Sequence, residues 1–179
     1  MTSALRQLLR EERGAAAAEM ALVTPLLLII MFGSVELGNF FMSEHALVKS
    51  VRDGARYAAR QSFTNFSGCS TTAASVPAGL ANDVKTLVRK GSLDSSAADR
   101  LPNWSSADAT FSVTVSCDTA TGGQTFGGIY QGNNVGTANA GPVVIVSASV
   151  PYRPVLASYG FTGVGLSLSA NQQAAVTGI

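Results

Sequence analysis

Two glutamates within a long apolar stretch are the residues of this chain whose type and position best suit chemistry. Residues 14–41 have the sequence GAAAAEMALVTPLLLIIMFGSVELGNFF, with Glu19 near the start, Glu36 near the far end and no charged residue between them. An ionisable side chain in a membrane segment is costly unless it is neutralised or paired with another group. Both glutamates are therefore candidate functional residues.

The sequence offers the two glutamates different partners. Cleavage of the chain after Gly14 would leave an amine at Ala15 that can pair with Glu19, and the amine of a neighbouring copy is the more specific partner. The alternative is that Glu19 only marks the edge of a membrane. Glu36 has no basic residue within one helical turn. It is therefore protonated, faces a partner subunit, or lies at the level of the outer lipid headgroups.

The other residue types that carry catalysis or bind metals form no recognisable constellation. His45 is the one histidine, and no cysteine or carboxylate lies at ligand spacing from it. No serine lies in a Gly-x-Ser-x-Gly sequence, and the glycine pairs at 122–123 and 127–128 lack the lysine of a phosphate-binding loop. We expect no catalytic residues, no metal site and no cofactor.

Composition favours a structural protein of the cell surface or the secreted space. The 179 residues suit one domain with an accessory segment, and the formal net charge of +1 argues against nucleic acid as a partner. Two cysteines, Cys69 and Cys117, follow the apolar stretch. In an oxidising compartment they predict one disulfide, which would stabilise the fold by about 4 kcal/mol; the alternative is two unrelated buried thiols.

A single long helix is predicted from about residue 15 to residue 62. Its first part, residues 15–42, would be about 40 Å long, which is enough to cross a hydrocarbon core of about 30 Å with some tilt. Pro25 removes one backbone hydrogen bond and should kink or loosen this part. Residues 43–62 continue as an amphipathic helix with a basic stripe, which is either a solvated surface or a docking site for acidic groups of a partner. The stripe consists of Lys49, Arg52, Arg56 and Arg60.

Residues 63–179 are predicted to form an extracytoplasmic head of the α+β class. A Ser/Thr/Gly-rich loop over 63–77 precedes a short amphipathic helix that ends near Gly91. Alternating or β-branched patterns predict strands over 110–117, 142–150 and 164–175. The loop between the first two strands, 118–141, is long enough to suggest a function. The head is then a small antiparallel sheet of about three strands, covered by the carboxy-terminal half of the long helix.

The orientation across the membrane does not follow from charge, because basic residues lie on both sides of the apolar stretch. We predict a cytoplasmic amino terminus from the polar leader and from the cysteines in the head. A cleaved secretory signal peptide is the rival interpretation, but no small-x-small cleavage site follows the apolar core.

Residues at both ends of the chain resemble a known family. Arg13-Gly14 followed by AAAAE resembles the type IV prepilin processing signal, in which a glycine precedes the cut and a glutamate lies five residues later. The fuller pattern resembles the TadE-like family, the minor pilins or pseudopilins of the tight adherence (Tad/Flp) pilus system. The matching positions are Pro25, Phe32-Gly33, Glu36-Leu37-Gly38, the DGARYAAR run at 53–60, and Pro151-Tyr152-Arg153-Pro154. Met20 departs from the phenylalanine expected after the glutamate.

The resemblance implies a non-enzymatic pilus component with a pilin-like fold. Residues 1–14 would be a leader that a prepilin peptidase removes after Gly14, leaving Ala15 as the mature terminus. Glu19, Pro25 and Glu36 would serve assembly. The implied partners are the peptidase, the other minor pilins, the major pilin, the inner-membrane assembly platform and the lipid bilayer. The protein would cross the bacterial inner membrane once with a periplasmic head and then enter the surface pilus. The alternative is a membrane-anchored periplasmic binding protein that is not cut at Gly14.

Overall fold

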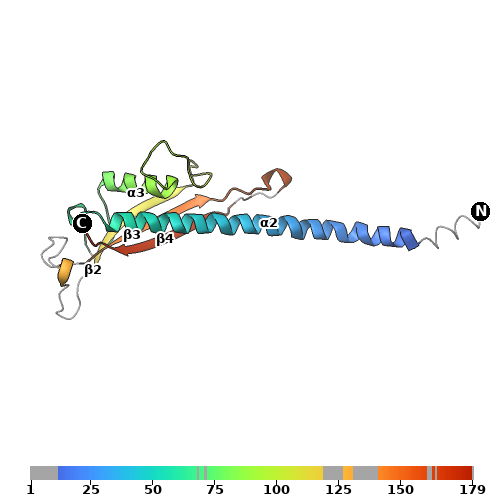
Figure 1. Ribbon diagram of the computed structural model, residues 1–179, viewed down its shortest axis with the longest axis horizontal. Coiled ribbons are helices and arrows are strands. Elements are labelled where there is room, and N and C mark those ends of the chain that lie inside the picture. The colour runs from blue at the N-terminus through green and yellow to red at the C-terminus, as the bar shows by residue number, and fades with distance from the viewer. Residues whose placement is uncertain are drawn as a thin grey trace, which may run out of the picture.

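The structure, a computed structural model, describes residues 12–67, 69–70, 72–118, 127–130, 141–160, 163 and 165–178. It consists of one long helix, α2 (Glu12–Ala59), and a head packed along the carboxy-terminal half of that helix (Figure 1). The predicted leader up to residue 11, and most of the long loop over 118–141, lie outside the described residues.

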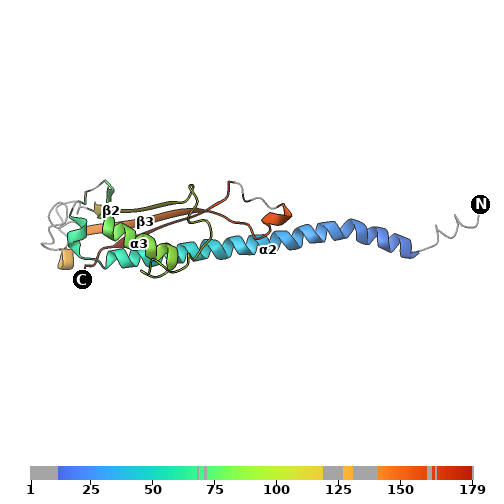
Figure 2. The same cartoon turned by 90° about the horizontal axis from the view of Figure 1, so that it is seen from above.

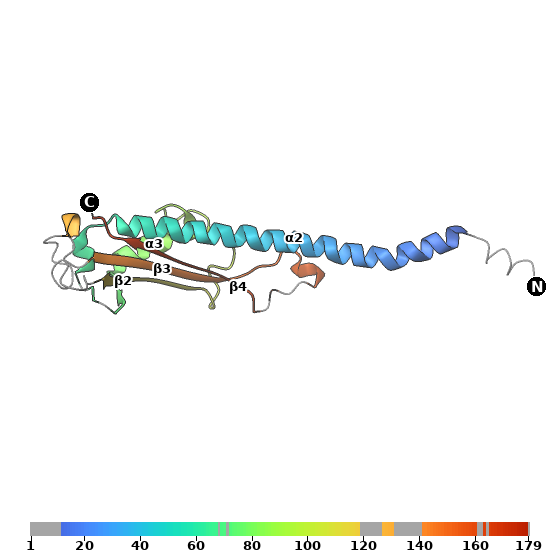
Figure 3. The same cartoon turned by 90° about the horizontal axis from the view of Figure 1, so that it is seen from below.

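Helix α2 is continuous over 48 residues and includes Pro25. The expected loosening at Pro25 does not interrupt the helix, which curves in its amino-terminal half (Figure 3). Every described side chain from Gly14 to Phe32 is exposed, whereas contact with the head begins at Gly33. The amino-terminal half of α2 is therefore a bare apolar rod.

The carboxy-terminal half of α2 is amphipathic, as predicted, and its apolar face forms part of the core. Leu47, Val51, Ala55 and Ala58 recur every three or four residues and are at most 2% exposed. This spacing places them on one face of the helix. α2 ends at Ala59, whose carbonyl oxygen accepts a hydrogen bond from the backbone N–H of Thr177 at 2.8 Å.

The sheet has four antiparallel strands in the order β1-β2-β3-β4. The long strands are β2 (Thr110–Asp118), β3 (Gly141–Pro151) and β4 (Ser167–Ala175), and they confirm the three predicted strands. β1 (Ala74–Ser75) is a two-residue edge strand within the stretch predicted to be a loop. The α+β class predicted from the sequence is confirmed.

Both helices cover one face of the sheet. The residues of β3 that face the helices, Val144, Val146, Ala148 and Val150, are buried, and they alternate with half-buried residues on the opposite face. The second helix, α3 (Ala78–Lys90), lies beside the carboxy-terminal half of α2 (Figure 2). It ends at Gly91, which has φ 76° and donates its backbone N–H to the Leu87 carbonyl. A left-handed residue at this place is a common helix terminus.

Gly54 allows α2 and α3 to approach closely. A Cβ atom built at this glycine would lie 2.5 Å from Cγ2 of Val88 and 3.3 Å from Cγ1 of Val84. Such a separation from Val88 is too short for two carbon atoms, so a larger residue would push the helices apart. Sequence analysis identified Gly54 only as a tolerable isolated glycine, and its packing role emerges from the tertiary structure.

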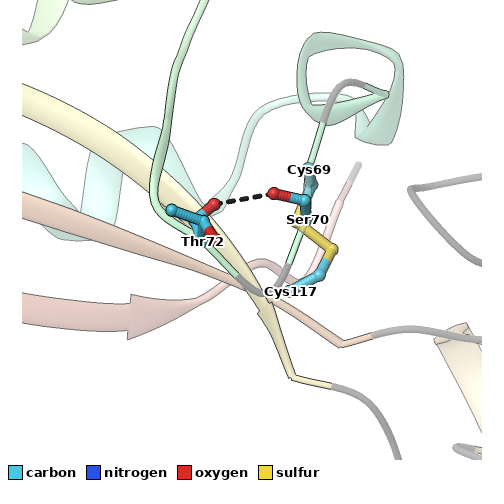
Figure 4. The surroundings of a disulfide bond; sticks show 4 residues. All are labelled: Cys69, Ser70, Thr72 and Cys117. Atoms are coloured by element: carbon cyan, nitrogen blue, oxygen red, sulfur yellow. Dashed lines mark hydrogen bonds between the residues drawn. A yellow bond between two sulfur atoms is a disulfide. The ribbon is translucent and has the colours of Figure 1, made fainter.

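Cys69 and Cys117 form a disulfide that ties the segment after α2 to the end of β2 (Figure 4). Both residues are buried, and the backbone N–H of Cys117 donates to the Ser70 carbonyl at 2.8 Å. The Ser70 hydroxyl in turn donates to the Thr72 carbonyl at 2.8 Å. The structure therefore contains the disulfide that the sequence predicted for an oxidising compartment.

Candidate functional site at the base of the head

The predicted processing and assembly residues lie on the bare half of α2. Gly14, Ala15 and Glu19 are exposed, and no described part of the head contacts them. Glu36 lies about 25 Å farther along the helix than Glu19, at the rise of an α-helix. The structure therefore does not bring the two glutamates together.

Glu36 is bound by the head of its own chain. One carboxylate oxygen, Oε1, accepts from the Tyr152 hydroxyl at 2.5 Å and from the backbone N–H of Val155 at 3.2 Å. The other, Oε2, accepts from the backbone N–H of Leu156 at 3.0 Å. Three donors thus surround the carboxylate, and together we call them the carboxylate clamp.

The spacing of residues on α2 explains how the clamp forms. Asn39 and Phe40 follow Glu36 by three and four residues, so all three lie on the same face of the helix. The Asn39 amide donates to the Tyr152 hydroxyl at 2.7 Å, which directs the hydroxyl proton toward Glu36. The Phe40 ring packs edge-on against the Tyr152 ring, with centroids 5.1 Å apart.

The chain turn after β3 supplies the rest of the clamp. β3 ends at Pro151, and Tyr152 pairs with Leu166 through a backbone hydrogen bond of 2.9 Å. The chain then turns at Pro154 and presents the two successive N–H groups that bind the carboxylate. Burial, together with the hydrogen bond to Glu36, raises the pKa of Tyr152 above that of an ordinary tyrosine, so the hydroxyl remains a donor at neutral pH.

Sequence reasoning missed this contact. It considered a protonated Glu36, a partner subunit or a headgroup position, whereas the structure satisfies Glu36 within the chain. The two segments that meet, Glu36-Leu37-Gly38 and the proline-flanked Tyr152, had each been singled out as family-like positions. Nothing in local spacing pairs residues separated by 116 positions.

An apolar hollow of about 340 Å³ lies beside the clamp. Its walls come from one face of α2 and from the head: Gly33, Glu36, Leu37, Phe40, Tyr152 and Leu166. The short helix η3 (Ala157–Tyr159) lies next to it, and the Tyr159 ring stacks on Phe32 with centroids 6.4 Å apart. The lining suits an apolar group and offers no constellation for catalysis.

The basic stripe lies on the solvent side of α2. Arg52, Arg56 and Arg60 are exposed, and none forms an ion pair with any residue that the structure describes. A different arginine, Arg100, reaches α2 from the head, where it lies 3.8 Å from Asp53 and donates to Ser50 at 3.1 Å. The stripe is therefore available to a partner, as the docking hypothesis requires.

A second charged cluster belongs to the head and holds a loop. Arg89 binds Asp99 at 2.6 Å, and Lys90 lies 3.7 Å from the same carboxylate. The hydrogen bond from Arg89 and the nearby cations lower the pKa of Asp99 against the opposing effect of burial. This cluster joins the end of α3 to the loop that precedes Arg100.

Metal-binding residues do not gather in the part of the chain that the structure describes. No group of three or more histidine, cysteine, aspartate or glutamate side chains there could hold a metal ion. His45 is exposed on α2.

Comparison with known proteins bears on the long helix. Residues 14–56 match the family described as TadE-like protein, which confirms the resemblance noted in the sequence for this segment. Searches of the curated proteins and of the solved structures gave no match. Within the described residues, one helix, Gly14–Ala59, is long and apolar enough to cross a membrane, and it therefore fits a membrane anchor.

Proposed function

Because residues 14–56 are TadE-like, we propose that this chain is a minor pilin or pseudopilin of a Tad/Flp pilus system. One observation carries the proposal. The bare half of α2 is apolar and exposed from Ala15 to Phe32, and Glu19 is its only charged residue. Such a surface requires either lipid or the helices of other subunits, and a pilin uses both in turn.

In this proposal a prepilin peptidase removes residues 1–14 and the helix remains in the inner membrane. The new amine at Ala15 carries a positive charge that the Glu19 carboxylate of a neighbouring subunit neutralises. Pairing lowers the cost of placing either charge in an apolar environment. The head lies in the periplasm, where the disulfide between Cys69 and Cys117 persists.

The mass of the mature protein tests the processing step. In cells that contain a prepilin peptidase, we expect a protein that begins at Ala15, and a Gly14→Val variant that keeps its leader. Gly38→Val is the matched control, because both glycines lie on α2 with open space around them. A wild-type protein that keeps Met1 in these cells would refute the proposal and favour the membrane-anchored binding protein.

A second variant separates assembly from processing. Glu19→Ala should still be cut after Gly14 but should impair piliation, because the amine of the neighbouring subunit loses its counter-charge. Glu44→Ala serves as the control, since Glu44 lies on the same helix beyond the bare apolar half. Normal piliation of Glu19→Ala would eliminate the pairing role and leave the interpretation that Glu19 marks the membrane edge.

The basic stripe provides the proposed docking surface for acidic groups of another pilin subunit or of the assembly platform. Arg56→Glu should reduce piliation without changing the fold, because the side chain is exposed and has no ion pair with a described residue. Lys85→Glu, an exposed substitution of the same kind on α3, is the control. Equal piliation in the two variants would show that the stripe is only a solvated surface.

A further inference from the structure

The turn that clamps Glu36 also carries exposed apolar side chains. We call residues 152–160 the base loop. Within it, Val155 is 59% exposed and Tyr159 is 80% exposed, and the neighbouring Leu166 is 53% exposed. On the adjacent surface of α2, Leu37 is 54% exposed. These residues surround the apolar hollow, so the surface is continuous rather than a scatter of single side chains.

The base loop lies where a membrane boundary should cross α2. From Ala15 to Phe32 the helix is about 27 Å long, slightly less than a hydrocarbon core of about 30 Å. With Ala15 at the inner boundary, the outer boundary therefore falls at the level of Phe32 and the residues just after it. The Tyr159 ring stacks on Phe32 at this level, and Figures 1 and 3 show η3 as the part of the head nearest the amino terminus.

The charges at this level suit a lipid surface. Residues 151–166 contain no acidic residue and one basic residue, Arg153, which is exposed. Glu36 is the carboxylate at this level, and its oxygens are occupied by Tyr152 and two backbone N–H groups. The clamp thus hides the one negative charge that would repel anionic headgroups, while tyrosine and arginine are the residue types that favour the membrane interface.

We propose that the base loop inserts into the outer leaflet of the membrane, with Val155, Tyr159 and Leu166 among the acyl chains and Arg153 at the headgroup phosphates. The head would then rest on the bilayer through a second contact besides the spanning helix. The inference rests on the proposed function in one respect, namely that α2 spans a membrane. It predicts a depth for each side chain that can be measured.

Tryptophan fluorescence in bilayers with brominated lipids tests the proposal. The full-length protein carries one tryptophan, Trp104, which is buried in the head and supplies a constant background. Tyr159→Trp in phosphatidylethanolamine–phosphatidylglycerol vesicles should lose at least about half of its added emission when the lipid is brominated near the headgroup. Quenching should be weaker when the bromines lie near the bilayer centre.

Two matched variants keep the result decisive. Ile129→Trp probes a residue with 54% exposure in η2 (Gly128–Tyr130), which lies at the opposite end of the head, where Tyr130 contacts Phe63. Its added emission should not be quenched. Leu28→Trp reports on the spanning helix and should be quenched most by bromines near the bilayer centre.

Each outcome has one meaning. Quenching of Tyr159→Trp and Leu28→Trp, but not of Ile129→Trp, supports the proposal. Quenching of Leu28→Trp alone overturns the insertion of the base loop and leaves the spanning helix of the proposed function intact. No quenching at Leu28 overturns both. If Tyr159→Trp resists quenching but its emission changes with the protein-to-lipid ratio, a second copy covers this surface instead, and the proposal is wrong.

Discussion

Removing the hydroxyl of Tyr152 should weaken the attachment of the head to α2. Tyr152→Phe deletes the group that donates to Glu36 and accepts from Asn39, while the ring that packs against Phe40 remains. Tyr152 is 6% exposed, so water cannot readily replace the lost donor. A hydrogen bond to a charged group contributes about 1.5–3 kcal/mol. Because Glu36 is only half-buried and keeps two backbone donors, we expect a loss of about 2 kcal/mol.

Urea unfolding of the full-length protein in detergent measures this loss. Trp104 is buried in the head and is the only tryptophan, so its fluorescence reports on unfolding of the head. With a slope of about 2 kcal/mol per molar urea, the midpoint should fall by about 1 M at constant slope. Tyr159→Phe is the control, because its hydroxyl makes no hydrogen bond with a described residue and is exposed.

A double-mutant cycle identifies the partner of the hydroxyl. Glu36→Gln keeps the size of the side chain but removes its charge, so it weakens the same hydrogen bonds. If Tyr152 and Glu36 interact as described, the two losses will not add, and the coupling energy will be about 1 kcal/mol. Additive losses, or a midpoint shift for Tyr152→Phe no larger than that of Tyr159→Phe, would refute the carboxylate clamp.

The remaining predictions use the same unfolding assay. Gly54→Val should cost about 2 kcal/mol, because its Cβ would lie 2.5 Å from Val88, and wild-type stability would contradict the close approach of the helices. Replacing Cys69 and Cys117 by serine should cost about 4 kcal/mol, whereas reductant should then have no further effect. The lowered pKa of Asp99 stabilises the fold above its unfolded pKa, and this contribution is lost as the pH falls through the folded pKa. Asp99→Asn should therefore flatten the decline in stability below about pH 4, and an unchanged decline would exclude this contribution.

Local periodicity accounts for the parts of the fold that were predicted. The three long strands follow from alternation of apolar and polar residues, as at Val113 and Val115 in β2, which are both buried. The amphipathic half of α2 follows from Leu47 and Val51 in the same way. In both cases the signal lies within one element, because the side-chain period of a strand or helix repeats over a few residues.

The features that were missed depend on segments distant in the sequence. The two-residue strand β1 exists because Ala74 pairs with Val115, and no pattern of two residues can announce a strand. The structural importance of Gly54 depends on which residues of α3 lie opposite it. A glycine in a helix carries no local mark of the neighbour that requires it.

The two glutamates with which the sequence draws attention to itself divide along the same line. The sequence by itself determined that the chain has an apolar rod, that Glu19 lies five residues after Gly14, and that Glu36 needs a partner, because these follow from composition and spacing. Only the tertiary structure decided that the partner is Tyr152 with the turn behind it. A carboxylate can be satisfied by any three well-placed donors, and which donors arrive depends on how β3 ends against α2 rather than on the residues beside Glu36.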